Sequence, residues 1–407
     1  MNRFTYVWNQ DHSVESYLDG IFEHPTDTHI YNGGPEFEFG TYNYSDPTVN
    51  WSTDRKFRQK LIRLSELKKS DPGLSDRLIY LRGIHSDPTD TNGELIRTVR
   101  PQVEEIFGRT ENMWSYLFWH NVRNHERDCI AQGQPSVLEH QSIVPDTLFC
   151  CLQHLPHDHR LSAWLALIDT GLTEHGLCTF CNTDRAWHQF LEQVLFSPKY
   201  EEFRIAGKRI LPYARQFFPP GHECDGNITQ LIPDYHRYLF DIVVESNTRS
   251  NFFTEKTFKP IFWGKPFVIL GSKSQNTILK DLGFETWPEY FDLTSDSELN
   301  LDDRKVRMLD DSIRQHYEKI ITPITELTDR NLVSIKRDVM PKVKHNHSVL
   351  IKHLFDDDLI PEYMWDEQLC DQDTHKCTLH ANYITDTRSW LSNHEYFKQF
   401  TPGFREG

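Results

Sequence analysis

Two apolar runs rich in β-forming residues enclose a polar segment and a helix-like segment within Phe240–Gly271. The first run ends at Val244, and the second covers Pro266–Leu270. Thr254, after the polar break, is a residue type that caps helix N-termini. The pattern predicts a strand, a loop, a helix that begins at Glu255, and a second buried strand. Such a unit places a helix N-terminus at the carboxyl end of a strand, where open α/β sheets bind phosphorylated ligands.

Similar apolar runs, bounded by turn residues, recur on both sides of this unit. They predict strands at Phe4–Trp8, His29–Asn32, Leu78–Ile84 and Leu148–Leu152. Apolar residues spaced three and four apart predict helices, because this spacing places them on one helical face. The predicted helices are Lys56–Lys69, which Asp71-Pro72-Gly73 ends; Asn112–Val122; a helix from Leu161 to a stop at Gly171; Ile278–Leu282; Asp303–Ile321; and Ile324–Met340. Pro341 is expected to end the sheet domain.

The alternation of strands and helices predicts an α/β fold, and 407 residues are enough for two domains with separate cores. We expect one α/β domain over residues 1–140 and a second over residues 146–340. The polar stretch Gln132–Pro145 is the expected linker. The tail, residues 341–407, is expected to be a helical appendage that packs back on the domains.

No run of about 18 apolar residues occurs, so we expect no membrane span. The N-terminus lacks the charged-then-apolar layout of a secretion signal, which favours a soluble protein of the cytoplasm. The formal net charge of −16 argues against tight, non-specific binding of nucleic acid, because such proteins present a basic surface. The net charge does not exclude a local basic groove.

The chain has eight cysteines, too few for a disulfide scaffold at this length. Cys178 and Cys181 form a C-x-x-C pair, and Cys370, Cys377 and His380 could be drawn as ligands. Zinc sites usually need two well-spaced ligand pairs. Reduced cytosolic thiols are therefore the favoured interpretation, and a metal at either group stays open.

The predicted helix N-termini carry residues suited to a nucleoside-diphosphate sugar. When such a donor reacts, negative charge builds up on the leaving diphosphate, and cations or N–H donors must offset it. Lys256 lies in the first turn of one helix and Arg160 at the start of another, each after a strand. Two cations at one diphosphate suit a transfer that needs no metal. Glu255 could accept hydrogen bonds from ribose, and Glu245 could face the sugar or hold the loop.

Each of these residues also has a structural interpretation. A lysine in a first helical turn is normally a solvated side chain, although the helix dipole slightly disfavours it there. Arg160 could pair with an acid such as Asp158, and Glu245 could be a surface carboxylate at a strand end.

Glu245-Ser246-Asn247 followed by Thr254-Glu255-Lys256 resembles the E-N-S…T-E-K signature of the α1,3-fucosyltransferase family, with Ser and Asn exchanged. Gly264–Val268 is similar to the family's later G-x-P-hydrophobic run, and Cys151–Arg160 to its arginine-bearing segment. The region Arg237–Asp292 is also similar to uncharacterised phage and giant-virus glycosyltransferase-like proteins. The sequence motifs that these proteins share correspond to Thr254–Ile261 and Leu282–Trp287 of this chain.

The resemblance implies a GT-B arrangement, in which two Rossmann-like domains face a cleft and the C-terminal one holds the donor. Lys256 and Arg160 would then hold the diphosphate and Glu255 the ribose, with Asn247 and Thr254 also at the donor. The implied activity is inverting transfer from a nucleoside-diphosphate sugar, with a GDP-linked donor as one candidate, to a glycan or other small hydroxyl acceptor. No metal and no further cofactor is implied.

Inversion requires a general base in the acceptor-side domain, residues 1–140, to remove the proton of the attacking hydroxyl. Glu36 and Glu38, which follow the turn Gly33-Gly34-Pro35, are candidates, and so is Asp11. Any exposed carboxylate would fit this role equally well.

Two other functions remain as alternatives. The acceptor could be a hydroxymethylated base of phage DNA, which would require a basic groove despite the acidic net charge and would place the protein in the host cytoplasm. The chain could also be a non-catalytic module that binds nucleotide sugars, since a fold alone does not establish catalysis.

Overall fold

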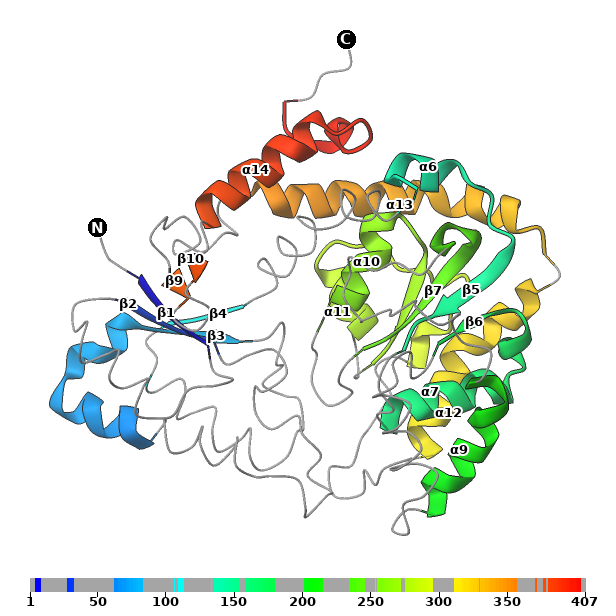
Figure 1. The fold of residues 1–407 in the computed structure, drawn as a ribbon, viewed down its shortest axis with the longest axis horizontal. Coiled ribbons are helices and arrows are strands. Elements are labelled where there is room, and N and C mark those ends of the chain that lie inside the picture. The colour runs from blue at the N-terminus through cyan, green and yellow to red at the C-terminus, as the bar shows by residue number, and fades with distance from the viewer. Residues whose placement is uncertain are drawn as a thin grey trace. The chain divides into compact units, whose positions relative to one another are not determined.

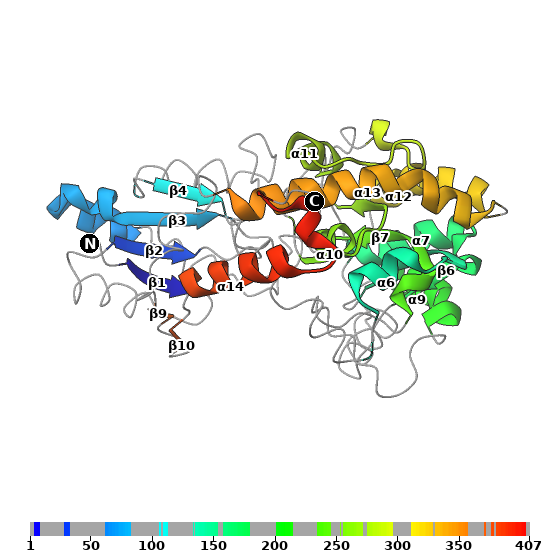
Figure 2. The same cartoon turned by 90° about the horizontal axis from the view of Figure 1, so that it is seen from above.

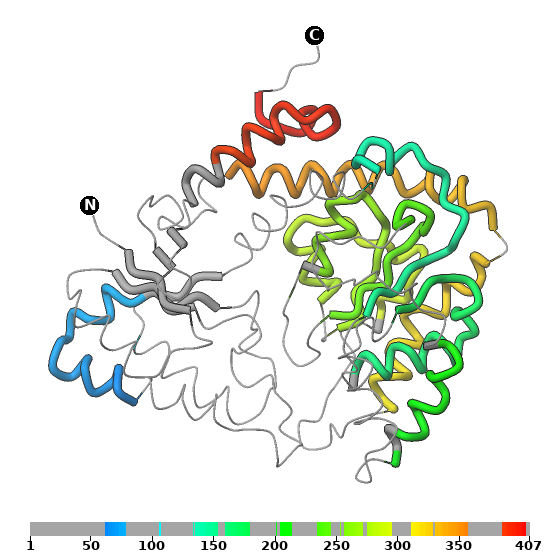
Figure 3. Tube along the Cα trace, in the orientation of Figure 1, coloured from blue at the N-terminus to red at the C-terminus, as the bar shows by residue number. Residues whose placement is uncertain are grey.

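The computed structural model describes residues 4–8, 28–32, 62–82, 106, 109–112, 133, 135–153, 158–179, 201–214, 234–245, 253, 255–271, 275–295, 311–328, 330–356, 370–371, 376–377 and 380–403. Its contacts divide the chain into two units. Figure 3 traces the chain, coloured by residue number. The first unit comprises Met1–Trp119, Arg249–Phe252 and His353–Trp390. The second comprises His120–Thr248, Phe253–Lys352 and Leu391–Gly407.

The first unit contains a sheet in the order β10-β9-β1-β2-β3-β4. The parallel strands β1 to β4 lie side by side in Figure 2, with β4 at the edge of the sheet. Strand β9 pairs parallel with β1, and β10 returns antiparallel to β9. The predicted strands at Phe4–Trp8, His29–Asn32 and Leu78–Ile84 are thereby confirmed in position. The bounds are β1 Phe4–Trp8, β2 Thr28–Asn32, β3 Leu78–Arg82, β4 Arg109–Asn112, β9 Cys370–Asp371 and β10 Lys376–Cys377.

The predicted break at Asp71-Pro72-Gly73 is confirmed. Residues 62–70 are helical, and the short 3-10 helix η1 (Pro72–Arg77) follows and leads into β3. The Asp71 carboxylate accepts a hydrogen bond from the Gly73 N–H at 3.1 Å and caps η1. Proline fits here because the first N–H of a helix has no internal partner.

The second unit contains a four-stranded sheet in the order β6-β5-β7-β8, with every pair parallel. From β5 (Thr147–Cys151) the chain moves outward to β6 (Gly176–Cys178). It then returns past β5 to β7 (Tyr238–Val244) and continues to β8 (Phe267–Leu270). The direction of winding therefore reverses between β5 and β7, as in doubly wound α/β sheets.

Helices cover both faces of this sheet. Because parallel crossovers are right-handed, the helices after β5 and β7 must lie on opposite faces. Figure 1 shows α7 (Asp158–Asp169) with α9 and α12 on one face, and α10 (Glu255–Trp263) with α13 on the other. The remaining bounds are α6 Val137–Ser142, η2 Leu172–Glu174, α9 Glu201–Ala214, η4 Tyr235–Arg237, α11 Gln275–Asp281, η5 Leu293–Ser295, α12 Asp311–Ile321, η6 Thr322–Leu327, α13 Leu332–Phe355, α14 His380–Asn393 and η9 Phe397–Phe400.

The strands of the second unit are apolar nearly throughout because both faces are covered. In β7 the exception is Asp241, which is buried. The Tyr235 hydroxyl donates to its Oδ2 at 2.5 Å, and the Lys259 ammonium lies 3.5 Å from the same oxygen. The carboxyl group is thus paired, as a buried acid requires.

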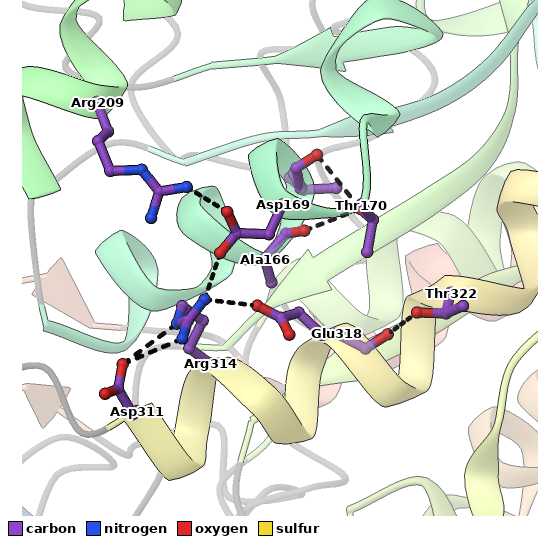
Figure 4. Close-up of polar contacts among 9 residues, drawn as sticks. Ala166, Asp169, Thr170, Arg209, Asp311, Arg314, Glu318 and Thr322 are labelled. Atoms are coloured by element: carbon purple, nitrogen blue, oxygen red, sulfur yellow. Dashed lines mark hydrogen bonds and ion pairs between the residues drawn. The ribbon is translucent and has the colours of Figure 1, made fainter.

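An ion network joins the helices on the α7 face of the sheet (Figure 4). Asp169, in the last turn of α7, bonds to Arg209 of α9 and to Arg314 of α12. Arg314 also pairs with Asp311 and, at 2.9 Å, with Glu318. An acid at a helix C-terminus is unfavourable by itself, so the two arginines offset its charge while they hold α9 and α12 to α7.

The predicted linker Gln132–Pro145 is wrong, because its centre forms helix α6 in the second unit. Ser136 and Glu139 form a capping box, in which each side chain accepts a hydrogen bond from the other's backbone N–H. Val137 and His140 are buried. The polar composition that suggested a linker is the exposed face of a short capped helix.

The predicted helix Ile324–Met340 is confirmed only from Leu332 onward: the 3-10 helix η6 occupies its beginning, and α13 continues through Pro341 to Phe355. An interior proline costs roughly 3 kcal/mol because it removes a backbone hydrogen bond. Burial of an apolar face on both sides of Pro341 offsets that cost. The buried residues of this face are Ile335, Val339, Val343, Leu350, Ile351 and Leu354.

The end of the chain contributes to the core of the second unit. Phe397 is fully buried, and its ring lies 5.1 Å from that of Phe262 in α10. The Tyr396 hydroxyl lies 2.9 Å from Nδ1 of His347, a buried residue of α13. Within the described part of the chain, no helix is long and apolar enough to cross a membrane.

Candidate functional site

The carboxyl ends of β5 and β7 form the candidate site. These strands are neighbours at the point where the winding reverses, which is where ligands bind in open α/β sheets. Helices α7 and α10 follow the two strands, so the N-termini of both helices lie at the same edge of the sheet. Unpaired N–H groups and the helix dipoles make such ends favourable for negative charge.

Arg160 lies in the first turn of α7 and is buried, with 5% of its surface exposed. A guanidinium is charged at any physiological pH, so this end of α7 holds a buried positive charge beside the carboxyl end of β5.

His159, the residue before Arg160, connects α7 to the end of β7. Its Nε2 donates a hydrogen bond to the Glu245 carbonyl oxygen at 2.7 Å, and the side chain is buried. Because a carbonyl can only accept, Nε2 carries the hydrogen. The sequence shows three histidines between strand and helix, but only the structure singles out this one.

Glu245 is completely buried, so the interpretation as a surface carboxylate is wrong. Its backbone N–H donates to the Leu270 carbonyl at 3.1 Å, and its Oε1 accepts a hydrogen bond from the Thr257 hydroxyl at 2.5 Å. Thr257 lies in the first turn of α10 and is itself buried. Glu245 therefore fastens the start of α10 to the ends of β7 and β8.

Lys256 is the second residue of α10 and is half-buried. A cation in a first helical turn is disfavoured by the helix dipole, by about 0.3–1 kcal/mol at exposed positions. An anion held at this end would interact favourably with both the ammonium and the helix.

Tight packing shapes the neighbouring end of β8. A Cβ on Gly271 would lie 1.7 Å from the Gln275 side-chain oxygen and 3.3 Å from the Glu245 Cβ, so a larger residue there would require the buried Gln275 side chain to move. Gln275, at the start of α11, is fully buried. The edge of the site on this side is therefore closely filled.

On the other side, Gln153 and Thr179 join the ends of β5 and β6. The Gln153 N–H donates to the Thr179 hydroxyl at 2.8 Å, and this hydroxyl donates to the Gln153 carbonyl at 3.1 Å. The Thr179 N–H donates to the Cys151 carbonyl at 2.9 Å. Both residues are buried and were not singled out from the sequence.

The cysteines at this edge are not poised for thiolate chemistry. Burial raises the pKa of the Cys151 thiol to about 12 and raises the pKa of Cys178 well above its usual value. Among the residues that the structure describes, no group of three or more His, Cys, Asp or Glu could hold a metal ion. Cys370 and Cys377 lie opposite each other in the antiparallel backbone pairing of β9 with β10.

Of the predicted site residues, Arg160, Glu245 and Lys256 belong to elements that meet at the β5/β7 edge. For Glu255 the structure describes only the backbone, as the first residue of α10. The remaining candidates lie outside the described residues; they are Asp11, Glu36, Glu38, Asn247, Thr254 and, from the proposed metal ligands, Cys181.

Comparison of the chain with protein-family models, curated proteins and solved structures gives no match.

Proposed function

We propose that the second unit binds a nucleoside-diphosphate sugar at the carboxyl ends of β5 and β7, and that the protein is an inverting glycosyltransferase. One observation carries the proposal. The reversal of winding brings the N-termini of α7 and α10, with Arg160 and Lys256 in their first turns, to one pair of adjacent strands. The resemblance of this region to α1,3-fucosyltransferases and to viral glycosyltransferase-like proteins adds support.

In the proposed reaction, the acceptor hydroxyl oxygen forms a bond to the anomeric carbon as the bond from that carbon to the β-phosphate oxygen breaks. The electron pair leaves with the nucleoside diphosphate, and the hydroxyl proton goes to a general base. Arg160, Lys256 and the N–H groups of the two helices would stabilise the departing charge. Glu36, Glu38 or Asp11, from an acceptor-side first unit in a GT-B arrangement, would serve as the base.

Glu245 and His159 are proposed to position this site rather than to contact the donor. Glu245 fixes the start of α10 through Thr257, and His159 fixes the start of α7 through the Glu245 carbonyl. Preorganised groups stabilise a transition state more effectively, because they need no rearrangement during the reaction. The network would therefore keep the two cations at a set separation.

The first experiment is a thermal-shift screen with GDP, UDP, CDP and dTDP and with one sugar conjugate of each. A ligand that binds the folded protein raises the unfolding midpoint. Donor hydrolysis, and transfer to glycan acceptors or hydroxymethylated duplex DNA, would then be measured with the nucleotide that binds. Binding without turnover of any acceptor would instead favour a non-catalytic module, and no binding to any of the eight probes would contradict the proposal.

Lys256→Ala tests the role of the α10 cation. We expect donor turnover to fall about a hundredfold or more, the size of effect seen when a transition-state donor is removed. The unfolding midpoint should change little because Lys256 is only half-buried. Lys280→Ala is the matched control, since Lys280 is exposed in the last turn of α11. Equal activity of the two variants would remove the assignment of Lys256.

A further inference from the structure

Gln153 has a buried polar atom that the fold leaves unused. Only 4% of the residue is exposed, and its side-chain oxygen Oε1 has no hydrogen-bond partner among the described residues. A buried carbonyl oxygen normally has a partner, so an unpaired one calls for an explanation such as a water or a ligand.

The rest of Gln153 is firmly held. Its backbone N–H and carbonyl both bond to the Thr179 hydroxyl, and its Nε2 donates to the Cys151 sulfur at 3.3 Å. Thr179 is held in turn by the Trp164 indole N–H, which donates to its carbonyl at 3.3 Å. The carboxamide is therefore fixed at the end of β5. Exchange of its oxygen and nitrogen would leave the other polar end unpaired instead.

Gln153 and Arg160 both interact with the Cys151 thiol. Burial raises the pKa of the Cys151 thiol, while the hydrogen bond from Gln153 and the charge of Arg160 act in the opposite direction. The carboxamide bonds to this sulfur directly, and the guanidinium acts on it through its charge. The Gln153 backbone bonds to Thr179 at the end of β6, so Gln153 lies at the β5/β6 end of this edge.

This position suggests which part of the donor Gln153 would meet. With the diphosphate between the first turns of α7 and α10, and the ribose beside Glu255 of α10, the nucleoside occupies the β7/β8 side. The transferred sugar then extends toward β5 and β6, where Gln153 lies. A sugar hydroxyl both donates and accepts hydrogen bonds, so it can pair with either orientation of the carboxamide.

We propose that the Gln153 carboxamide is a specificity-determining group that hydrogen-bonds a hydroxyl of the transferred sugar. This inference rests on the proposed function and extends it, because it assigns the sugar, rather than the nucleotide, to the β5/β6 end of the site. The ligand it requires is a hydroxylated sugar carried on a nucleoside diphosphate.

Gln153→Met tests the inference, because it keeps the length of the side chain and removes its polar atoms. We expect the ligand-free variant to be as stable as the wild type or more stable, since it loses an unpaired buried oxygen. We expect a roughly three- to tenfold weaker affinity for the nucleotide sugar, the loss typical of one hydrogen bond, and an unchanged affinity for the nucleoside diphosphate alone. Calorimetry with GDP and GDP-fucose, and with UDP and UDP-glucose, measures both.

Gln141→Met is the matched control. Gln141 also has a buried side-chain oxygen without a described partner, but its Nε2 donates to the Trp263 carbonyl at 2.7 Å, at the C-terminal end of α10 and away from the candidate site. We expect this variant to lose stability and to keep the affinity for both ligands. Gln153→Leu provides a second apolar replacement at the proposed position.

Each outcome separates the inference from the proposed function. If the wild type binds none of these nucleotides or nucleotide sugars, the proposed function fails and the inference with it. Suppose that the wild type binds a nucleotide sugar. If Gln153→Met binds this nucleotide sugar equally well, or if its affinity for the nucleoside diphosphate alone falls by the same factor as its affinity for the nucleotide sugar, only the inference is overturned. Strong destabilisation of both Gln153→Met and Gln153→Leu would also overturn it, because the carboxamide oxygen would then have a partner within the protein.

Discussion

At the scale of single residues, the candidate site depends on a few polar groups that are buried rather than exposed. Glu245 is fully buried between a strand end and the first turn of α10, and its carboxyl group accepts a hydrogen bond from Thr257. His159 donates to the carbonyl of the same Glu245. One residue therefore couples the starts of two helices that lie on opposite faces of the sheet.

Thr257→Val should show how much this coupling contributes. The substitution keeps the shape of the side chain and removes the hydroxyl, so a buried carboxyl oxygen loses its donor. We expect the free energy of unfolding to fall by about 1–3 kcal/mol. Urea denaturation measures the change, and Thr257→Ser, which keeps the hydroxyl, should retain most of the stability. Equal stability of the Val variant and the wild type would mean that the hydrogen bond contributes nothing.

The sequence identified only part of this arrangement. Arg160, Glu245 and Lys256 were found because they follow apolar runs at the ends of predicted strands. The burial of Glu245 and the bond from His159 could not be predicted, because they join residues that are far apart in the chain. Gln153 was missed because nothing in its local pattern distinguishes it from any other glutamine after a strand.

At the scale of helices and strands, apolar runs were reliable, whereas the expected end of one helix at Met340 was wrong. The strands β5, β7 and β8 lie where their runs predicted them, because a strand covered on both faces must be apolar throughout. Gly171, with a positive φ of 72°, follows α7 as expected of a helix stop. Pro341 did not end its helix, since the buried face of α13 outweighs one missing hydrogen bond.

Pro341→Ala should consequently stabilise the protein. Pro341 is exposed, so the substitution removes no packing, and it restores a backbone N–H to α13. An interior proline costs roughly 3 kcal/mol, and its stiffening of the unfolded chain returns at most about 1 kcal/mol, so we expect a gain of about 2 kcal/mol. Thermal unfolding measures the gain. Lys344→Ala, exposed in the same helix, should change the midpoint little, and a loss of stability in Pro341→Ala would contradict the expectation.

At the scale of the whole molecule, the two units are not two consecutive halves of the chain. The second unit takes its final segment, Leu391–Gly407, after the chain has contributed His353–Trp390 to the first unit. The order of strands in each sheet and this return of the chain are set by long-range contacts. Local sequence patterns do not carry that information.

His347 makes the attachment of the final segment sensitive to acid. It is fully buried, and its Nε2 donates to the Phe262 carbonyl at 3.1 Å while its Nδ1 accepts from the Tyr396 hydroxyl at 2.9 Å. Burial lowers the pKa of His347 to about 4 from an unfolded value near 6.5. Between these pH values the unfolded chain binds more protons than the folded protein. The contribution of neutral His347 to the free energy of unfolding is therefore complete above pH 6.5 and is lost as the pH falls to about 4.

We expect this loss to amount to about 3 kcal/mol for His347 alone. Denaturation at a series of pH values from 7 to 4, for the wild type and for His347→Gln, isolates the effect. Glutamine can still donate and accept hydrogen bonds but does not titrate, so the difference between the two curves should narrow as the pH falls. Parallel curves would show that His347 does not sense acid in the folded protein.

The four-stranded sheet ends at β8 with a side chain in place of a strand. The Asn276 carboxamide accepts from the Ile269 N–H and donates to the Ile269 carbonyl, both at 3.0 Å, so it occupies the pair of backbone groups that a further strand would use. Exposed strand edges are sites where other molecules can add a strand and aggregate. A single asparagine thus gives this sheet a built-in barrier against intermolecular growth.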